Sequence, residues 1–184
     1  EIMPNTFRNT RSLQTLDLSG NSLKGLPESL ESLKNLKEID VSFNNIENLE
    51  PEVMKSWRNL EEFRASNNKL QELVQGTLKN LPVLQYVDLS SNDISTIHRG
   101  AVRNLPELQE LVLADNRILE LRERAFEDLQ NLQAIHLQQN NLRMISPDAF
   151  YNSPSILYLN LSTNQFRHLE NLNIRNVRNL EVLD

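Results

Sequence analysis

Apolar residues recur along the chain in one fixed arrangement. Three leucine-like positions, spaced LxxLxL, end three residues before an asparagine, and a fourth follows it by two residues. Successive asparagines lie 23 residues apart once and then 24 residues apart five times. They are Asn21, Asn44, Asn68, Asn92, Asn116, Asn140 and Asn164. Such a constant period predicts a repeat architecture in which each repeat forms one coil of a solenoid.

The residues before each asparagine have the pattern of a strand with one buried face. Leu111, Val112 and Leu113 illustrate it, because neighbouring side chains in a strand point to opposite sides. One strand per repeat at constant spacing predicts a parallel sheet. The chain must then turn, and its backbone groups there need partners. An asparagine side chain offers both a donor and an acceptor, so we expect the seven asparagines to form a structural ladder without a ligand role.

Further apolar columns lie in the second half of each repeat. The first is Ile2, Leu26, Leu49, Leu73, Ile97, Leu121, Ile145 and Leu169. The second is Phe7, Leu30, Met54, Leu78, Val102, Phe126, Phe150 and Ile174. In the third column, Trp57 is predicted to fill the core, and Thr10 and Ser153 are polar exceptions. The predicted fold is an α/β solenoid with a curved parallel sheet on the concave face and short helical or irregular turns on the convex face.

The repeats cover the whole chain, so residues 1–184 are predicted to form one array. Ile2 to Thr10 fit the second half of a repeat, and Leu180 and Leu183 begin another strand. The array therefore has seven recognisable repeats and partial repeats at both ends. Because solenoids need polar caps on their terminal coils, we expect this chain to be an interior piece of a longer array.

The frame resembles the leucine-rich-repeat superfamily over the whole chain. Leu121-x-x-x-x-Phe126-x-x-Leu129 and Ile145-x-x-x-x-Phe150 resemble the 24-residue extracellular class found in Toll-like receptor ectodomains, Slit proteins and the insect adhesion proteins chaoptin and artichoke. The absence of cysteine and of insertions is most similar to the interior of a chaoptin-like array. The resemblance implies cell-surface adhesion or receptor work without catalysis. The 23-residue first repeat, with Leu26-Pro27-x-x-Leu30, is closer to intracellular members.

Composition narrows the function classes. The formal net charge of −6 argues against nucleic-acid binding, which needs clustered cations. No apolar run approaches the roughly 20 residues that cross a bilayer. The chain has no cysteine, and its three histidines occupy different places in the repeat. We therefore predict a protein without enzymatic activity, cofactor or metal site.

The outward strand positions are the remaining candidates for binding. Aromatic residues and exposed apolar groups favour interface centres, which predicts a protein-binding patch at Tyr86, Asp88, Glu110, Val112, His136 and Tyr158. An acidic concave patch is predicted at Asp17, Glu38, Asp40 and Glu62. The alternative is that both are ordinary solvated sheet residues. The expected partner is another protein, with homophilic binding as one option.

Two locations fit these observations. The leading hypothesis is an extracellular or cell-surface membrane glycoprotein that acts as an adhesion protein or receptor, and the alternative is a cytoplasmic scaffold or regulatory subunit. Asn160-Leu161-Ser162 matches the N-glycosylation signal. Because Leu161 is predicted to point into the core, Asn160 should face outward. Asn160 is therefore the candidate glycosylation site.

Overall fold

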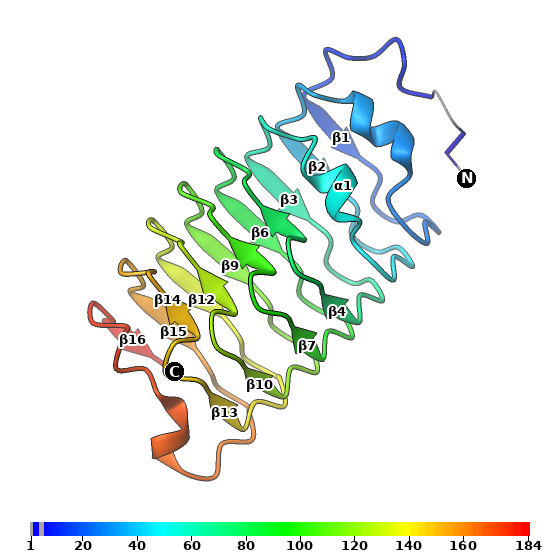
Figure 1. Cartoon of the computed structure of the whole chain (residues 1–184). Coiled ribbons are helices and arrows are strands. Elements are labelled where there is room, and N and C mark those ends of the chain that lie inside the picture. Colours follow the sequence, from blue (N-terminus) through cyan, green and yellow to red (C-terminus); the bar gives the residue numbers. More distant parts are fainter. Residues whose placement is uncertain (1, 4–5) are drawn as a thin grey trace.

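The chain forms a solenoid of stacked coils, each contributing one strand to a single parallel sheet (Figure 1). The structure is a computed structural model that describes residues 2–3 and 6–184. The sheet contains, in order, β1 (Thr15–Asp17), β2 (Glu38–Asp40), β3 (Glu62–Arg64), β6 (Tyr86–Asp88), β9 (Glu110–Val112), β12 (Ala134–His136), β15 (Tyr158–Asn160) and β16 (Val182–Leu183). The curved parallel sheet predicted from the sequence is confirmed.

The register of the sheet follows the repeat period. Thr15 pairs with Glu38, and Glu38 pairs with Glu62, so equivalent residues of successive repeats lie side by side. The one-residue difference in spacing between these two steps is absorbed outside the strands. Any property that recurs every 24 residues in the sequence therefore becomes a straight row across the face of the sheet.

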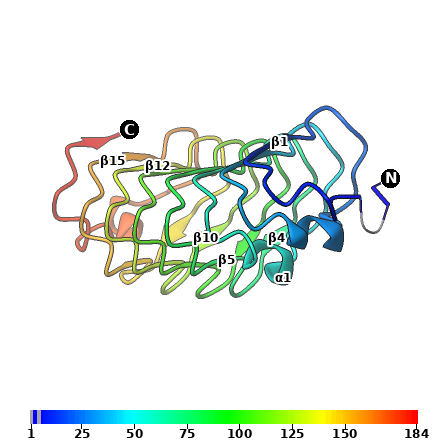
Figure 2. The same ribbon diagram turned by 90° about the horizontal axis from the view of Figure 1, so that it is seen from above.

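The opposite side of the solenoid carries short strands in its middle and short helices toward its ends (Figure 2). The four-stranded sheet there consists of β5 (Leu78–Lys79), β8 (Val102–Arg103), β11 (Phe126–Glu127) and β14 (Phe150–Tyr151). Two further pairs are β4 (Glu72–Leu73) with β7 (Thr96–Ile97) and β10 (Glu120–Leu121) with β13 (Met144–Ile145). The helical elements are η1 (Glu28–Ser32), α1 (Pro51–Met54) and η2 (Leu169–Leu172).

Of the predicted short helical or irregular turns, the helical ones lie near the ends, and the turns in the middle form short strand pairs. Stacked 24-residue coils bring equivalent backbone positions together, and their backbone groups form hydrogen bonds with each other. For example, the Leu78 N–H donates to the Ala101 carbonyl at 2.9 Å. In the earlier coils, prolines favour helical turns instead. Pro51 begins α1, a position where its missing N–H is not needed.

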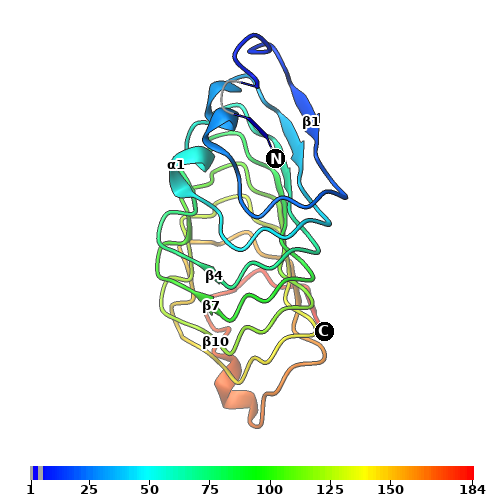
Figure 3. The same ribbon diagram turned by 90° about the vertical axis from the view of Figure 1, so that its right-hand side faces the viewer.

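The two layers run side by side along the stack (Figure 3). The hydrophobic core lies between them. Trp57 is fully buried, as predicted, and its Nε1–H donates to the Leu30 carbonyl at 3.1 Å. Phe126 and Phe150 stack with ring centroids 5.7 Å apart. Of the two polar exceptions, Thr10 is exposed and Ser153 is buried, where its hydroxyl accepts a hydrogen bond from the Leu129 N–H.

For one residue of the predicted inward columns, the prediction of burial is wrong. Leu169 is 86% exposed rather than buried. It begins η2, which places this coil's backbone in a 3₁₀ turn where the equivalent residues Leu121 and Ile145 form strands. Leu172 and Ile174 pack against the core instead. The turn geometry, which the apolar period does not encode, decides which leucine is buried.

The repeated asparagines bridge neighbouring coils. The Asn92 Nδ2–H donates to the carbonyls of Ala65, one coil earlier, and of Leu89 in its own coil, at 3.0 and 3.1 Å. The Oδ1 of Asn92 accepts from the Leu70 N–H at 3.0 Å. Equivalent bonds recur at Asn44, Asn68, Asn116, Asn140 and Asn164. Each asparagine side chain therefore bonds to backbone N–H and C=O groups that have no backbone partner at the turn.

Replacing Asn92 by Ala should lower the free energy of unfolding by about 1–3 kcal/mol, because buried backbone groups of two coils lose their partners. Equilibrium urea unfolding measures the change. Asn21→Ala is the matched control, since Asn21 is exposed and, within the described residues, its side chain donates only to the Leu18 and Ser19 carbonyls of its own coil. Its cost should be lower, about 0.5 kcal/mol. Equal costs would contradict a ladder that acts between coils.

Candidate functional site

The outward side chains of the eight-stranded sheet form two parallel rows, which together we call the concave face. The first row is Thr15, Glu38, Glu62, Tyr86, Glu110, Ala134, Tyr158 and Val182. The second row is Asp17, Asp40, Arg64, Asp88, Val112, His136 and Asn160. All the residues predicted for the two patches therefore lie on one surface, on neighbouring strands.

The acidic half of this face is interrupted by one cation. Glu38 pairs with Glu62 across β2 and β3, and Asp40 pairs with Arg64. The Arg64 guanidinium forms an ion pair with Glu62. It also lies over the Tyr86 ring, with its central carbon 5.3 Å from the ring centroid. The continuous acidic surface therefore contains Asp17, Glu38 and Asp40, while Glu62 is compensated.

Three aspartates of the second row also hold the turn that follows their strand. The Oδ1 atoms of Asp17 and Asp40 accept from the N–H groups of Ser19 and Ser42, both at 2.8 Å. Asp88 accepts from the Ser90 N–H in the same way. Hydrogen bonding with the Ser19 side chain, and then with its backbone, lowers the pKa of Asp17. This role was not predicted from the sequence, although Asp two residues before Ser is typical of such turns.

The other half of the face is joined into a network. The His136 Nε2 lies 3.1 Å from the Glu110 carboxylate, and the His136 and Tyr158 rings have centroids 5.2 Å apart. The Tyr158 hydroxyl donates to the Asp184 carboxylate at 2.9 Å and accepts from the Asn160 Nδ2–H at 3.0 Å. The side chains of Glu110, His136, Tyr158 and Asn160 are thus held in place before any partner binds. Val112 and the more distant Tyr86 are not part of this network.

Both tyrosines of this half resist ionisation. Donation to Asp184 is the main cause that raises the pKa of Tyr158. Burial, followed by the carboxylates of Asp88 and Glu110, raises the pKa of Tyr86. The two phenols therefore remain neutral hydrogen-bond donors throughout the physiological pH range.

The glycosylation signal is partly engaged by its own residues. Leu161 is buried and Asn160 lies on the concave face, as the alternation of the strand predicts. The Asn160 Oδ1 accepts from the Ser162 N–H at 3.0 Å and from the Ser162 hydroxyl at 2.7 Å. Its Nδ2 is the donor to Tyr158. A sugar on Nδ2 would therefore stand beside the Tyr158 end of the face.

A column that we call the rim follows the concave face, one residue before each ladder asparagine. All seven members have a positive φ, between 52° and 66°. They are Gly20, Phe43, Asn67, Ser91, Asp115, Gln139 and Thr163. Phe43 is the exception in chemistry, and its side chain is 62% exposed. Phe43 was not predicted from the sequence as a candidate residue, although it is the one aromatic side chain at this position of the repeats.

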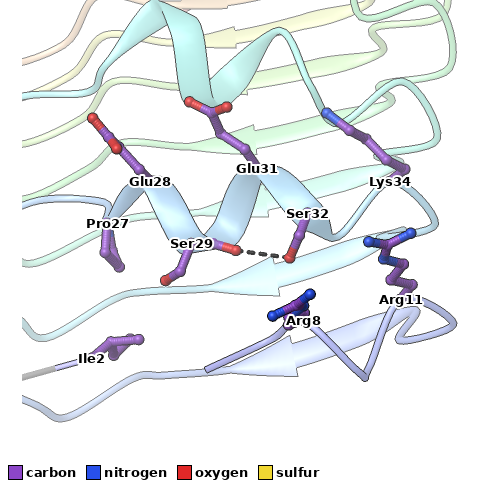
Figure 4. A pocket seen from close by; sticks show the side chains of 9 residues that line it. All are labelled: Ile2, Arg8, Arg11, Pro27, Glu28, Ser29, Glu31, Ser32 and Lys34. Carbon is purple, nitrogen blue, oxygen red and sulfur yellow. Dashed lines mark hydrogen bonds between the residues drawn. The ribbon is translucent and has the colours of Figure 1, made fainter. Parts of the chain in front are cut away.

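A cavity of about 760 Å³ lies away from the concave face, between η1 and the segment that precedes β1 (Figure 4). Arg8, Arg11 and Lys34 line it together with Glu28 and Glu31. Figure 4 shows the guanidinium groups of Arg8 and Arg11 on the other side of η1 from the two carboxylates. This cavity contains none of the residues predicted for binding, and its mixed charges favour no single ligand class.

The Tyr158 network predicts a spectroscopic difference. Asp184→Asn should lower the pKa of Tyr158, because an amide accepts the phenol proton less strongly and carries no charge to oppose ionisation. Titration followed by the ultraviolet absorbance of the phenolate measures this pKa. The chain has only three tyrosines, so few groups contribute to the signal. Tyr86, three strands away in the sheet, serves as the internal reference. An unchanged Tyr158 titration would show that the hydrogen bond to Asp184 is not formed in solution.

Comparison with known proteins identifies the repeat. The "Leucine rich repeat" family model matches residues 34–94, 58–118 and 106–166. The "Leucine Rich repeats (2 copies)" model matches residues 11–51. No curated protein sequence matches the chain significantly. Within the described residues, no helix is both long enough and apolar enough to span a membrane.

Solved structures share the fold over almost the whole chain. TLR13, in a complex with ssRNA13, has a TM-score of 0.88 and 27% identity, covering 98% of this chain and 26% of its own. An internalin of Listeria monocytogenes has a TM-score of 0.73 and 23% identity, covering 98% and 50%. A leucine-rich-repeat protein of Leptospira interrogans has a TM-score of 0.66 and 25% identity, covering 99% and 51%.

The partial coverage of these solved chains limits which of their functional properties can be assigned to this chain. The chain spans at most about half of each of these three solved chains. Because the TLR13 structure is a complex with RNA, the comparison does not support the exclusion of nucleic acid that the net charge predicted. The matches to the repeat models cover most of the chain without a break between residues 11 and 166. This chain belongs to the leucine-rich-repeat family.

Proposed function

We propose that this chain is a non-enzymatic scaffold segment that binds another protein through its concave face. The observation that carries the proposal is the ordered network of Glu110, His136 and Tyr158 on that face. Binding orders side chains at a free-energy cost, and here hydrogen bonds and ring contacts already hold them. Membership of a family whose proteins generally act as protein-binding scaffolds supports the same function.

The chemistry of the network favours a protein partner. Tyrosine presents a large surface with a polar tip, and buried aromatic residues dominate many protein interfaces. Tyr86 adds a second ring, stacked against Arg64 on the neighbouring strand. Between the two tyrosines lies Val112, which is half-buried and apolar. The surface thus combines an apolar centre with hydrogen-bonding groups around it, as protein interfaces do.

We place this scaffold outside the cell, in an adhesion protein or receptor. The similarity to TLR13 supports this location. The Asn160-Leu161-Ser162 signal supports it independently, because Asn160 lies at the surface of a folded strand. In that setting the concave face would meet a partner from another cell or from the surrounding medium.

Concave-face variants test the binding surface. The chain is screened against a panel of secreted and cell-surface proteins, with a second copy of the chain and single-stranded RNA included. Tyr86→Ala combined with Tyr158→Ala should weaken protein binding at least tenfold, since both aromatic contacts are removed. Tyr151→Ala is the matched control, because Tyr151 is an exposed tyrosine of β14 on the opposite side. Protein binding that survives the double variant would refute the network of Glu110, His136 and Tyr158 as the contact surface, and binding confined to RNA would refute the protein-binding function.

Charge reversal separates recognition from folding. Glu38→Lys should alter protein association and leave the melting temperature nearly unchanged, because Glu38 is exposed. Glu62→Lys and Asp40→Lys complete the set. Of these, Asp40→Lys should also lower stability, since Asp40 accepts the Ser42 N–H. If none of the three changes binding, the acidic patch is ordinary solvated surface.

Glycosylation tests the location. Mass spectrometry of the protein from its native source should find a glycan on the peptide that contains Asn160 and none after Ser162→Ala, which removes the signal but keeps the asparagine. A glycan there would direct a partner toward Tyr86 and Val112, away from Tyr158. An unmodified Asn160 would leave the extracellular location supported only by resemblance.

A further inference from the structure

Phe43 occupies a position for which its side chain is poorly suited. The other rim residues are glycine or polar, and Asn67, Ser91 and Asp115 share its positive φ of 52–54°. That region of the backbone favours glycine and asparagine and is unfavourable for a bulky side chain. Folding alone would therefore favour a residue such as asparagine in place of Phe43.

The ring of Phe43 contributes nothing to the core. It is 62% exposed and is not among the hydrophobic residues that pack against the buried cluster. No aromatic or cation–π contact found within residues 2–3 and 6–184 includes it. Its neighbour in the rim on one side is Gly20, where an added Cβ would meet no atom within 4 Å. The ring is therefore open to a partner on that side.

Carboxylates lie on the strands beside Phe43, and Arg64, the register partner of Asp40 on β3, is paired with Glu62. Asp40 lies three residues before Phe43 in the same coil, and Asp17 is the partner of Asp40 on β1. Glu38 completes this group at the other end of β2. Both aspartates are held by turn hydrogen bonds at 2.8 Å, so their charges keep a fixed position relative to the rim. Lys24 and Lys69 follow farther along their coils, beyond the ladder asparagines.

We infer that Phe43 and the carboxylates of Asp17, Glu38 and Asp40 form a docking site for a protein segment that carries lysine or arginine beside an apolar pocket. This inference rests on the proposed protein-binding function. It names a second contact area, separate from the predicted protein-binding patch that extends from Tyr86 to Tyr158. Phe43 enters the pocket, and the cations of the partner face the acidic strand ends. The same carboxylates repel phosphate groups, which disfavours anionic lipid or nucleic acid at this site.

The test uses a phage-displayed library of random peptides, selected on the whole chain. Selected peptides, synthesised and measured by fluorescence anisotropy, should combine lysine or arginine with apolar residues. Phe43→Asn should weaken their binding at least tenfold while keeping or raising the melting temperature, because asparagine adopts a positive φ more easily. Asp40→Asn should weaken binding severalfold, with the turn preserved as it is at Asn160.

A matched variant moves the ring by one coil. In Phe43→Asn combined with Asn67→Phe, the aromatic residue lies beside Arg64 instead of Asp40, since Arg64 and Asp40 are register partners. Binding should not return. Peptides that bind equally well to Phe43→Asn, or that bind again to the moved ring, overturn this site but leave the proposed function intact. Failure to select any peptide contradicts this site alone, because the screen against whole proteins tests the proposed function separately.

Discussion

The hydrogen bonds that cross from one coil to the next are the constraint on which the rest of this structure depends. A solenoid coil buries its apolar side chains only against its neighbours, so its turns must align with theirs. The asparagine ladder does this from the side chain, as when Asn92 contacts the backbone at both Ala65 and Leu70 of the preceding coil. Strand pairing does it from the backbone.

This alignment turns a one-dimensional period into a two-dimensional surface. Because Tyr86 lies beside Glu110 and His136 beside Asn160, residues 24 positions apart become immediate neighbours. Rows of unlike side chains can then form networks that no short segment could form, such as that of Glu110, His136 and Tyr158. The same geometry separates the acidic end of the face from its aromatic end.

Structural and binding roles overlap on this surface. Asp17 and Asp40 hold the turns after their strands while their charges remain on the concave face. Phe43 shows the opposite relation, because it stands at a strained and exposed rim position where a smaller residue would suit the fold better. The contrast helps to separate residues that serve the coil from residues available to a partner.

The repeat period was enough to predict the parallel sheet, its outward rows and the burial of Trp57, because those features depend only on which positions recur. It could not predict that Leu169 turns outward, or that strand pairs replace helices in the middle turns. These depend on the backbone path of each turn and on what the adjacent coil offers to it. Likewise, the candidate residues Glu110, His136 and Tyr158 were visible in the sequence, but their connection was not. Distances between coils arise only when the chain is stacked, so the network and the isolation of Phe43 belong to the tertiary structure.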